Sequence, residues 1–169
     1  MPHREGVGEE HPKTHLIHII CIFTFILVCI SDSIFFNFTT FLINFIPWFI
    51  RIILCGIFII IALIFMWLSG KAVFPNSQEG ISLVKTGILA HVRHPMYLGT
   101  PLIFIAFIFL TLSLISIVPL IITLFFFNKM IKFEEKDLER KFGQEFLDYK
   151  KKVPRWFPRL TPAKFEESS

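Results

Sequence analysis

The chain has 169 residues, of which 54% are hydrophobic and 22 are phenylalanine, so it has the length of one domain but is too apolar for a water-soluble one. Its net charge is only +4, and eleven of its seventeen Lys and Arg residues lie after Asn128. This distribution argues against a nucleic-acid partner and is typical of the cytoplasmic side of a membrane protein. We therefore expect an all-α integral membrane protein with a single membrane domain, residues 1–169.

The first apolar run is long enough to cross a membrane. A bilayer core of about 30 Å requires about 20 helical residues, and residues 16–36 satisfy this length. The run lacks a small-x-small cleavage pattern and more apolar runs follow, so we expect an uncleaved helix. Asp32 lies near its outer end, where we expect water to solvate the carboxylate.

Cysteine and histidine spacing gives no metal site. The three cysteines all fall inside apolar runs, without the paired spacing of zinc sites or disulfide frameworks. His11, His15 and His18 could stack on one helix, but no carboxylate or cysteine completes a ligand set. We therefore expect buried structural thiols and no bound metal.

A second span follows a broken connection. Residues 37–47 are apolar but interrupted by polar residues and proline, which suits an interfacial segment with Trp48 as an anchor. We expect the second span at residues 49–69, with Arg51 reaching outward to the interface.

The next apolar stretch is too long for one perpendicular helix and predicts a hairpin of two short spans, residues 96–111 and 115–133. Pro119 then falls in the first turn of the returning helix, where its missing amide is tolerated. With four spans, both termini and all basic residues except Arg51 lie on one side, which the positive-inside rule makes cytoplasmic. We expect the membrane to be the prokaryotic inner membrane or the endoplasmic reticulum.

Two polar segments share the cytoplasmic side, a loop at residues 70–95 and a tail at residues 134–169. Both adjoin spans that end at the same surface of the membrane. We therefore expect any chemistry to occur where the loop and the tail meet.

An Arg-His-Pro-x-Tyr string opens the third span. Pro95 disfavours the helical conformation at the preceding residue and suits the first helical position, so we expect a helix to begin there with His94 as its N-cap. The amides of Met96 and Tyr97 then lack helical partners and, with the helix dipole and Arg93, form a site for an anion. The alternative is that the basic residues only anchor the helix among lipid headgroups.

Two glutamates lie where the fourth span leaves the membrane. Glu134 and Glu135 are close to the hydrocarbon boundary, where an unpaired carboxylate is costly, so a cationic partner is expected. That partner could be a lysine of the chain or a bound sulfonium or ammonium group. Beyond them, apolar residues recur every three or four positions as far as Tyr149 and precede lysines at 150–152. This pattern predicts an amphipathic helix that anchors the tail to anionic lipid.

Taken together, these motifs resemble the C-terminal half of the isoprenylcysteine carboxyl methyltransferase and phospholipid methyltransferase superfamily. The resemblance covers about residues 70–160, with the motifs in the family's order and spacing. The matching residues are Leu83-Val84, Thr86-Gly87, Val92-Arg93-His94-Pro95-Met96-Tyr97-Leu98-Gly99, Glu134-Glu135, Phe142-Gly143, Tyr149, Val153-Pro154-Arg155 and Pro158.

The resemblance implies an S-adenosylmethionine-dependent methyltransferase whose lipophilic acceptor enters sideways from the bilayer. The cofactor-binding residues that it implies are Ile81, Ser82, Leu83, Val84, Leu89, His94, Pro95, Met96, Tyr97 and Glu134. We expect Arg93 to bind a carboxylate of the acceptor or the cofactor. An amine acceptor would have to lose a proton, for which Glu135 or His91 is a candidate base.

Three positions depart from the eukaryotic isoprenylcysteine enzymes. Ile81 and Leu89 stand where those enzymes carry a histidine and a tyrosine. Met130 stands where they carry the arginine that holds the substrate carboxylate, and Lys129 or Lys132 is the candidate replacement. The acceptor is therefore left open between a prenylcysteine, an aminophospholipid and a small thiol.

Two other classes of function fit parts of the sequence. Membrane sterol reductases share the general architecture but bind a nicotinamide cofactor, NADPH. A non-catalytic membrane scaffold would use the basic tail to bind anionic lipid or a partner.

Overall fold

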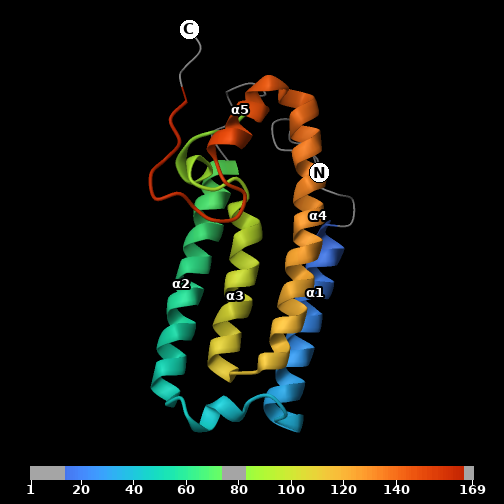
Figure 1. The fold of residues 1–169 in the computed structure, drawn as a ribbon, viewed down its shortest axis with the longest axis vertical. Helices are drawn as coiled ribbons and strands as arrows, with labels where there is room; N and C mark the ends of the chain where they lie inside the picture. The colour runs from blue at the N-terminus through green and yellow to red at the C-terminus, as the bar shows by residue number, and fades with distance from the viewer. Residues whose placement is uncertain (1–13, 74–82, 166–169) are drawn as a thin grey trace.

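The computed structural model describes residues 14–73 and 83–165, which contain helices and no strand, so the all-α class is confirmed for this part of the chain. Four long helices and one short helix carry the architecture (Figure 1). They are α1 (Thr14–Ile30), α2 (Trp48–Val73), α3 (Pro95–Thr111), α4 (Ile117–Phe142) and α5 (Gln144–Lys152). A π-helical turn at Ser31–Phe36 and short 3-10 turns at Phe41–Asn44, Gly87–Ala90 and Leu114–Ser116 complete the description.

The long helices run antiparallel in chain order, with α1 beside α4 and α2 beside α3 (Figure 1). The contact between α2 and α3 is the most extensive and depends on Gly99. A Cβ atom at that position would lie 2.6 Å from Cγ of Met66, so any larger residue would force the side chain of Met66 to move. Because α3 and α4 are antiparallel, the start of α3 lies at the same end of the bundle as the C-terminal part of α4 (Figure 1).

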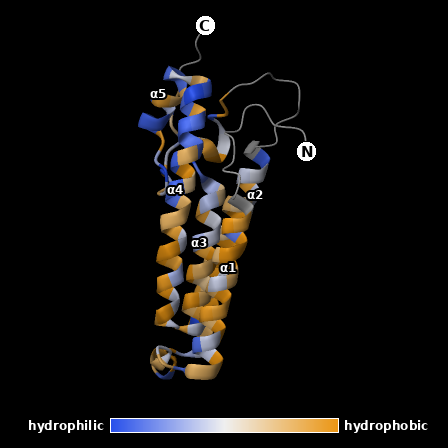
Figure 2. Ribbon diagram, turned by 90° about the vertical axis from the view of Figure 1, so that its right-hand side faces the viewer, coloured by the Kyte–Doolittle hydropathy of each residue, from blue (hydrophilic) through white to orange (hydrophobic). Residues whose placement is uncertain are grey.

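Three of the helical segments are long and apolar enough to cross a bilayer: Leu16–Phe36, Trp48–Lys71 and Leu114–Phe142. The fourth, α3, has 17 residues, a length of about 25 Å. Large apolar side chains such as Phe23 and Ile60 are more than half exposed, which is favourable in lipid and unfavourable in water. Figure 2 shows hydrophobic residues along most of the bundle and hydrophilic residues gathered at α5 and the adjoining end of α4.

The predicted hairpin is present as α3 and α4, joined by residues 112–116. Pro119 is the third residue of α4, in the first turn as expected. The helix does not stop at residue 133, however, but continues to Phe142. Gly143 ends it with φ of +54°, a conformation that glycine adopts at little cost, and the chain turns there into α5.

The expectation that water solvates Asp32 is wrong. Asp32 is 4% exposed, and its carboxylate accepts hydrogen bonds from the amide and hydroxyl of Thr39, at 3.2 and 2.5 Å, and from the hydroxyl of Ser113 at 2.7 Å. These donors come from the segment after α1 and from the turn between α3 and α4. The carboxylate therefore joins two segments at this end of the bundle instead of facing solvent.

Replacing Asp32 with alanine should lower the free energy of unfolding by about 1–3 kcal/mol, because the buried hydroxyl of Ser113 would lose its acceptor. Asp32→Asn keeps an acceptor oxygen and should lose less. Thermal unfolding in detergent micelles checks both variants. Equal losses for alanine and asparagine would contradict the hydrogen-bonding role of this side chain.

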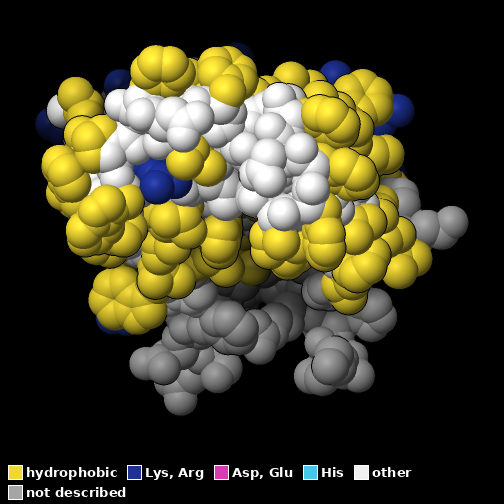
Figure 3. Space-filling model, turned by 90° about the horizontal axis from the view of Figure 1, so that it is seen from below, with side chains coloured by type: hydrophobic (Ala, Val, Ile, Leu, Met, Phe, Trp, Pro, Cys, Tyr) yellow, Lys and Arg dark blue, Asp and Glu magenta, His cyan; other side chains and the backbone are white. Residues whose placement is uncertain are grey.

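Arg51 makes a contact that the sequence did not predict. Its Nη1 donates to the carbonyl oxygen of Leu110 at 3.3 Å, in the last turn of α3. The positive charge therefore lies at the negative end of a helix dipole. Figure 3 views the molecule from this end and shows mainly hydrophobic side chains around one small basic patch.

The predicted amphipathic helix is divided at Gly143 between the end of α4 and α5, and its apolar face packs against the protein. Phe146 and Tyr149 are 1% and 4% exposed and form a cluster with Leu83 and Val153. The apolar face of α5 is therefore covered by the loop before α3 and by the tail instead of by lipid, while binding of anionic lipid by the lysines at 150–152 stays a prediction.

Candidate functional site

The start of α3 presents uncapped backbone amides. Pro95 is the first helical residue and His94 is the N-cap, as the sequence predicted, but the side chain of His94 makes no capping hydrogen bond. In an α-helix the amides of the first turn have no partner within the helix. Met96 and Tyr97 therefore present N–H groups at the positive end of the helix dipole.

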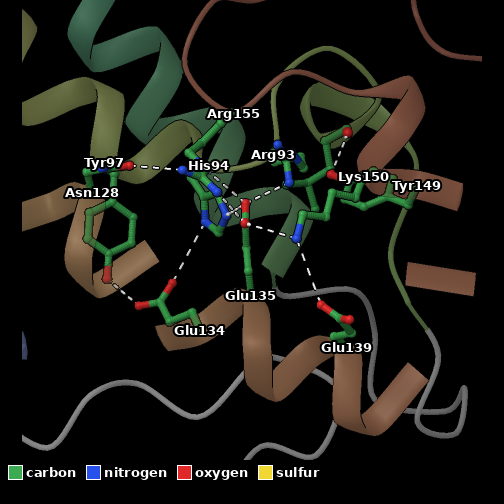
Figure 4. A network of polar contacts seen from close by, with 11 residues as sticks. Arg93, His94, Tyr97, Asn128, Glu134, Glu135, Glu139, Tyr149, Lys150 and Arg155 are labelled. Atoms are coloured by element: carbon green, nitrogen blue, oxygen red, sulfur yellow. Dashed lines mark hydrogen bonds and ion pairs between the residues drawn. The ribbon is translucent and has the colours of Figure 1, made fainter. Parts of the chain in front are cut away.

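The side chain of His94 points instead toward two glutamates of α4 (Figure 4). Its Nε2 lies 3.3 Å from a carboxylate oxygen of Glu135, and its Nδ1 lies 3.8 Å from Glu134. Glu134 also accepts a hydrogen bond from the hydroxyl of Tyr97, in the first turn of α3. The acidic segment of α4 and the start of α3 thus form one buried polar cluster, although 37 residues separate Tyr97 from Glu134.

Glu135 is held by cations on several sides. Nη1 of Arg93 lies 2.7 Å away, and Arg155 donates twice, from Nε at 3.1 Å and from Nη2 at 2.5 Å. Lys150 lies 3.9 Å away, and the third donor of Arg155 binds the side-chain oxygen of Asn128 at 2.9 Å. The side chain of Glu135 is only 3% exposed. A buried carboxylate so strongly compensated is a poor proton acceptor, so the expectation of Glu135 as a general base is not supported.

Burial shifts the proton affinities of the groups around this cluster. It lowers the pKa of His94 below its ordinary value, although the hydrogen bond to Glu135 opposes the shift. Burial also lowers the pKa of Arg93, again opposed by Glu135, and raises the pKa of Tyr149. At neutral pH we therefore expect a neutral imidazole beside charged guanidinium groups.

His94 should make the fold sensitive to acid. Because its folded-state pKa lies below the unfolded value of about 6.5, the unfolded chain binds more protons as the pH falls through that range, and stability falls with it. The melting temperature in detergent should drop between about pH 7 and about pH 5, and less steeply in His94→Gln. An equally steep drop in that variant would assign the acid sensitivity to other groups.

Backbone hydrogen bonds attach the C-terminal tail to the loop that carries Arg93. The amide of Arg93 donates to the carbonyl of Pro154 at 3.0 Å, and the amide of Arg159 donates to the carbonyl of His91 at 3.0 Å. Nδ1 of His91 lies 2.7 Å from the carbonyl of Arg159. Because a carbonyl oxygen can only accept, Nδ1 of His91 carries the hydrogen, and Nε2 keeps the lone pair that a base requires.

An apolar wall adjoins the Tyr97–Glu134 pair. Tyr97 packs with Phe127, Met130 and Ile131 in a buried cluster, against which Ile17, Trp156 and the ring of His18 are also placed. Since Met130 and Glu134 are four residues apart on α4, they share a helix face, and Phe127 and Ile131 lie beside them. The polar cluster is therefore bounded by aromatic and aliphatic side chains.

The family model for phospholipid methyltransferases matches residues 46–145, more than half of the 169 residues. The chain belongs to the phospholipid methyltransferase family. The matched region runs from just before α2 to the start of α5 and includes Arg93, His94, Tyr97 and both glutamates. The resemblance noted in the sequence is thereby confirmed, and the chain is an integral membrane protein.

A curated relative is similar over a shorter region. The chain is 43% identical over 72 residues to the protein-S-isoprenylcysteine O-methyltransferase of Saccharomyces cerevisiae (strain ATCC 204508 / S288c). The similar region is 42% of this chain and 30% of that relative. The match therefore spans less than a third of the relative's length.

The structure does not bring the predicted acceptor-binding lysines into this cluster. Lys129 and Lys132 are exposed, whereas Met130 is buried, and Nζ of Lys129 lies 4.5 Å from the ring centre of Phe125. Met130 itself is 3% exposed within the apolar wall. Neither lysine therefore replaces the missing arginine in this conformation.

The other implied cofactor contacts are distributed around the loop. Pro95 is buried, Met96 is 56% exposed, and the side chain of Leu83 packs against α5. Val84 is half-buried, and the carbonyl of Leu89 accepts a hydrogen bond from Tyr149 at 2.8 Å. Ile81 and Ser82 lie outside the described residues, as does His11.

Sequence reasoning missed four residues of this region: His18, Asn128, Arg155 and Trp156. Asn128 could have been found, because it lies seven residues before Glu135 and thus on the same helix face. Arg155 was noted only as part of a motif. Nothing in the sequence near it indicated that it would bind a glutamate 20 residues earlier.

Proposed function

We propose that the chain is an S-adenosylmethionine-dependent methyltransferase that acts on a lipophilic acceptor at the membrane. The observation that carries the proposal is the pairing of the uncapped start of α3 with the buried Tyr97–Glu134 pair of α3 and α4. The family and the name of the yeast relative support the same class of reaction.

The residues fit a zwitterionic ligand with an additional positive charge. The ligand's carboxylate suits the amides of Met96 and Tyr97 and the Nε of Arg93, a buried donor that has no acceptor among the described residues. Its ammonium or sulfonium charge suits the carboxylate of Glu134. His94, Pro95, Leu83, Val84 and Leu89 would complete the site, together with Ile81 and Ser82. When bound, S-adenosylmethionine supplies an activated methyl group.

In this proposal the protein contributes alignment, electrostatics and exclusion of water. Glu134 holds positive charge near the start of α3, and the Glu135 cluster fixes Arg93 and His94 in position. Phe127, Met130 and Ile131 keep water from the membrane side of the site. These are the contributions that a displacement at a methyl group requires.

The acceptor is proposed to reach the site from the bilayer, past the apolar wall. The yeast relative's name points to a prenylated cysteine and the family's description to a phospholipid. We propose cytoplasmic termini and a single membrane domain, because the basic residues gather at the end of the bundle that holds the site.

Calorimetry on the detergent-solubilised chain tests the proposal. Binding of S-adenosylhomocysteine is the expected result. Binding of NADPH in its place would support a sterol-reductase-like enzyme, and binding of neither would support a non-catalytic scaffold.

A further inference from the structure

Two arginines converge on the carboxylate of Glu135, but they bind it in different ways (Figure 4). Arg155, from the tail, forms a fork, because its Nε donates to Oε1 at 3.1 Å and its Nη2 donates to Oε2 at 2.5 Å. Arg93, from the loop before α3, donates to the same carboxylate from Nη1 alone, at 2.7 Å from Oε1. Its Nε is buried and has no acceptor among the described residues. The tail arginine therefore has the stronger arrangement, and the loop arginine keeps one donor unused.

The position of Arg155 is fixed by its surroundings. Its remaining nitrogen, Nη1, donates to the side-chain oxygen of Asn128 on α4 at 2.9 Å. The preceding residue, Pro154, accepts the amide of Arg93 at 3.0 Å, and the following residue, Trp156, packs against the apolar wall. The backbone on both sides of Arg155 is thus attached to the rest of the protein, and its guanidinium group is oriented from two directions along α4.

We infer that Arg155 is a positioning residue, which keeps Nε of Arg93 available for the carboxylate of the bound cofactor. The inference rests on the proposed function. A guanidinium group binds a carboxylate most strongly through two parallel N–H donors. If Arg155 were absent, Oε2 of Glu135 would lose its guanidinium partner, and Arg93 would be able to form the fork itself with Nε and a second nitrogen. That arrangement would consume the donor that the cofactor requires.

Burial gives the unused donor of Arg93 its value. The side chain of Arg93 is 10% exposed, and a buried donor without an acceptor costs free energy that a bound carboxylate would recover. Arg93 lies two residues before Pro95, where α3 begins. Its Nε and the uncapped amides of the first turn can therefore serve the same carboxylate.

The test compares Arg155→Lys with wild type by calorimetry in detergent, with S-adenosylhomocysteine and with its decarboxylated analogue. The lysine keeps a positive charge beside Glu135 but cannot form the fork. Affinity for S-adenosylhomocysteine should fall about tenfold, the scale of one hydrogen bond to a charged group, while affinity for the analogue should change by less than about twofold. Equal losses for the two ligands, as a merely structural role predicts, or no loss for either, would overturn the inference.

Arg159→Lys is the matched control. Arg159 also attaches the tail, since its Nη1 donates to the carbonyl of Lys152 at 2.5 Å, but its described hydrogen bonds do not involve Glu135. Its affinities for both ligands should stay within about twofold of wild type, as expected for an exposed side chain. A second variant, Asn128→Ala, removes one support of the fork. It should lose affinity for S-adenosylhomocysteine alone, by about threefold.

A further readout uses the wild-type chain. In protein with ¹⁵N-labelled arginine, the Nε–H resonance that disappears in Arg93→Lys should shift when S-adenosylhomocysteine is added and stay unchanged with the decarboxylated analogue. Wild-type protein that binds S-adenosylhomocysteine without this shift would overturn the inference alone. Failure of the wild-type protein to bind S-adenosylhomocysteine would overturn the proposed function instead.

Discussion

Glu134→Gln should weaken binding of S-adenosylhomocysteine at least about 30-fold, because a buried carboxylate that faces a cationic ligand group is replaced by a neutral amide. The substitution keeps the shape of the side chain and an acceptor oxygen for the hydroxyl of Tyr97. The fold should therefore survive, and the loss should be seen in affinity and not in the melting temperature. Calorimetry and thermal unfolding in the same detergent measure the two quantities.

Glu139→Gln is the matched control for this prediction. Glu139 lies further along the same helix, but its side chain is 45% exposed and its nearest cation is Lys150 at 3.8 Å. Its removal should leave the affinity within about twofold, the scale expected for an exposed ion pair. Equal affinities of Glu134→Gln and wild type would remove Glu134 from the site.

Glu135→Gln should instead act on stability. Glu135 compensates Arg93 and Arg155, whose side chains are 10% and 22% exposed, so its loss leaves two guanidinium groups without their counter-ion. Breaking a buried pair in this way costs about 3–5 kcal/mol. We expect a large fall in the melting temperature in detergent. The hydrogen bonds between the tail and the loop that carries Arg93 should weaken as well.

The same Glu139→Gln variant serves as the control, with a change of less than about 1 kcal/mol expected. A double replacement, Arg155→Leu with Glu135→Leu, distinguishes the contribution of the ion pair from that of the packing around the two side chains. If the pair compensates itself, the double variant should be more stable than Glu135→Gln. A Glu135→Gln protein as stable as wild type would show that the cations are compensated elsewhere.

Hydropathy and proline predicted much of the scaffold. The length of an apolar run is a direct measure of whether a helix can cross a bilayer, and the class of the fold follows from it. Pro95 placed the start of α3 to the residue, because its ring restricts the preceding backbone. The proposal that Glu134 faces a cation also came from the sequence, through the cost of a carboxylate at the membrane boundary.

Tertiary partners account for what the sequence did not predict. Asp32 looked solvated because its acceptor role depends on Ser113, 81 residues away. The apolar face of α5 looked like a lipid anchor because Leu83, which covers it, lies in a distant loop. The local sequence correctly indicated that Asp32 is polar and that α5 has an apolar face. It could not indicate which distant segment would pack against either of them.

The angular position of residues around α4 could have been used to test the lysines predicted to bind the acceptor. Lys129 and Lys132 are close to Met130 in sequence, yet a helix of 3.6 residues per turn places them away from the face shared by Met130 and Glu134. Distance along the chain suggested a replacement for the missing arginine, whereas the angle around the helix excluded it. The position of His18 beside Phe127 and Tyr97 could only be found from the packing of α1 against α4.

Ultraviolet cross-linking of radiolabelled S-adenosylmethionine to the intact chain, followed by peptide mapping, tests most directly whether the start of α3 and the acidic segment of α4 form one binding site. Label in the peptides that contain Tyr97 and Glu134, removed by competing S-adenosylhomocysteine, is the expected result. Label confined to other helices, or label that the competitor does not remove, would contradict it.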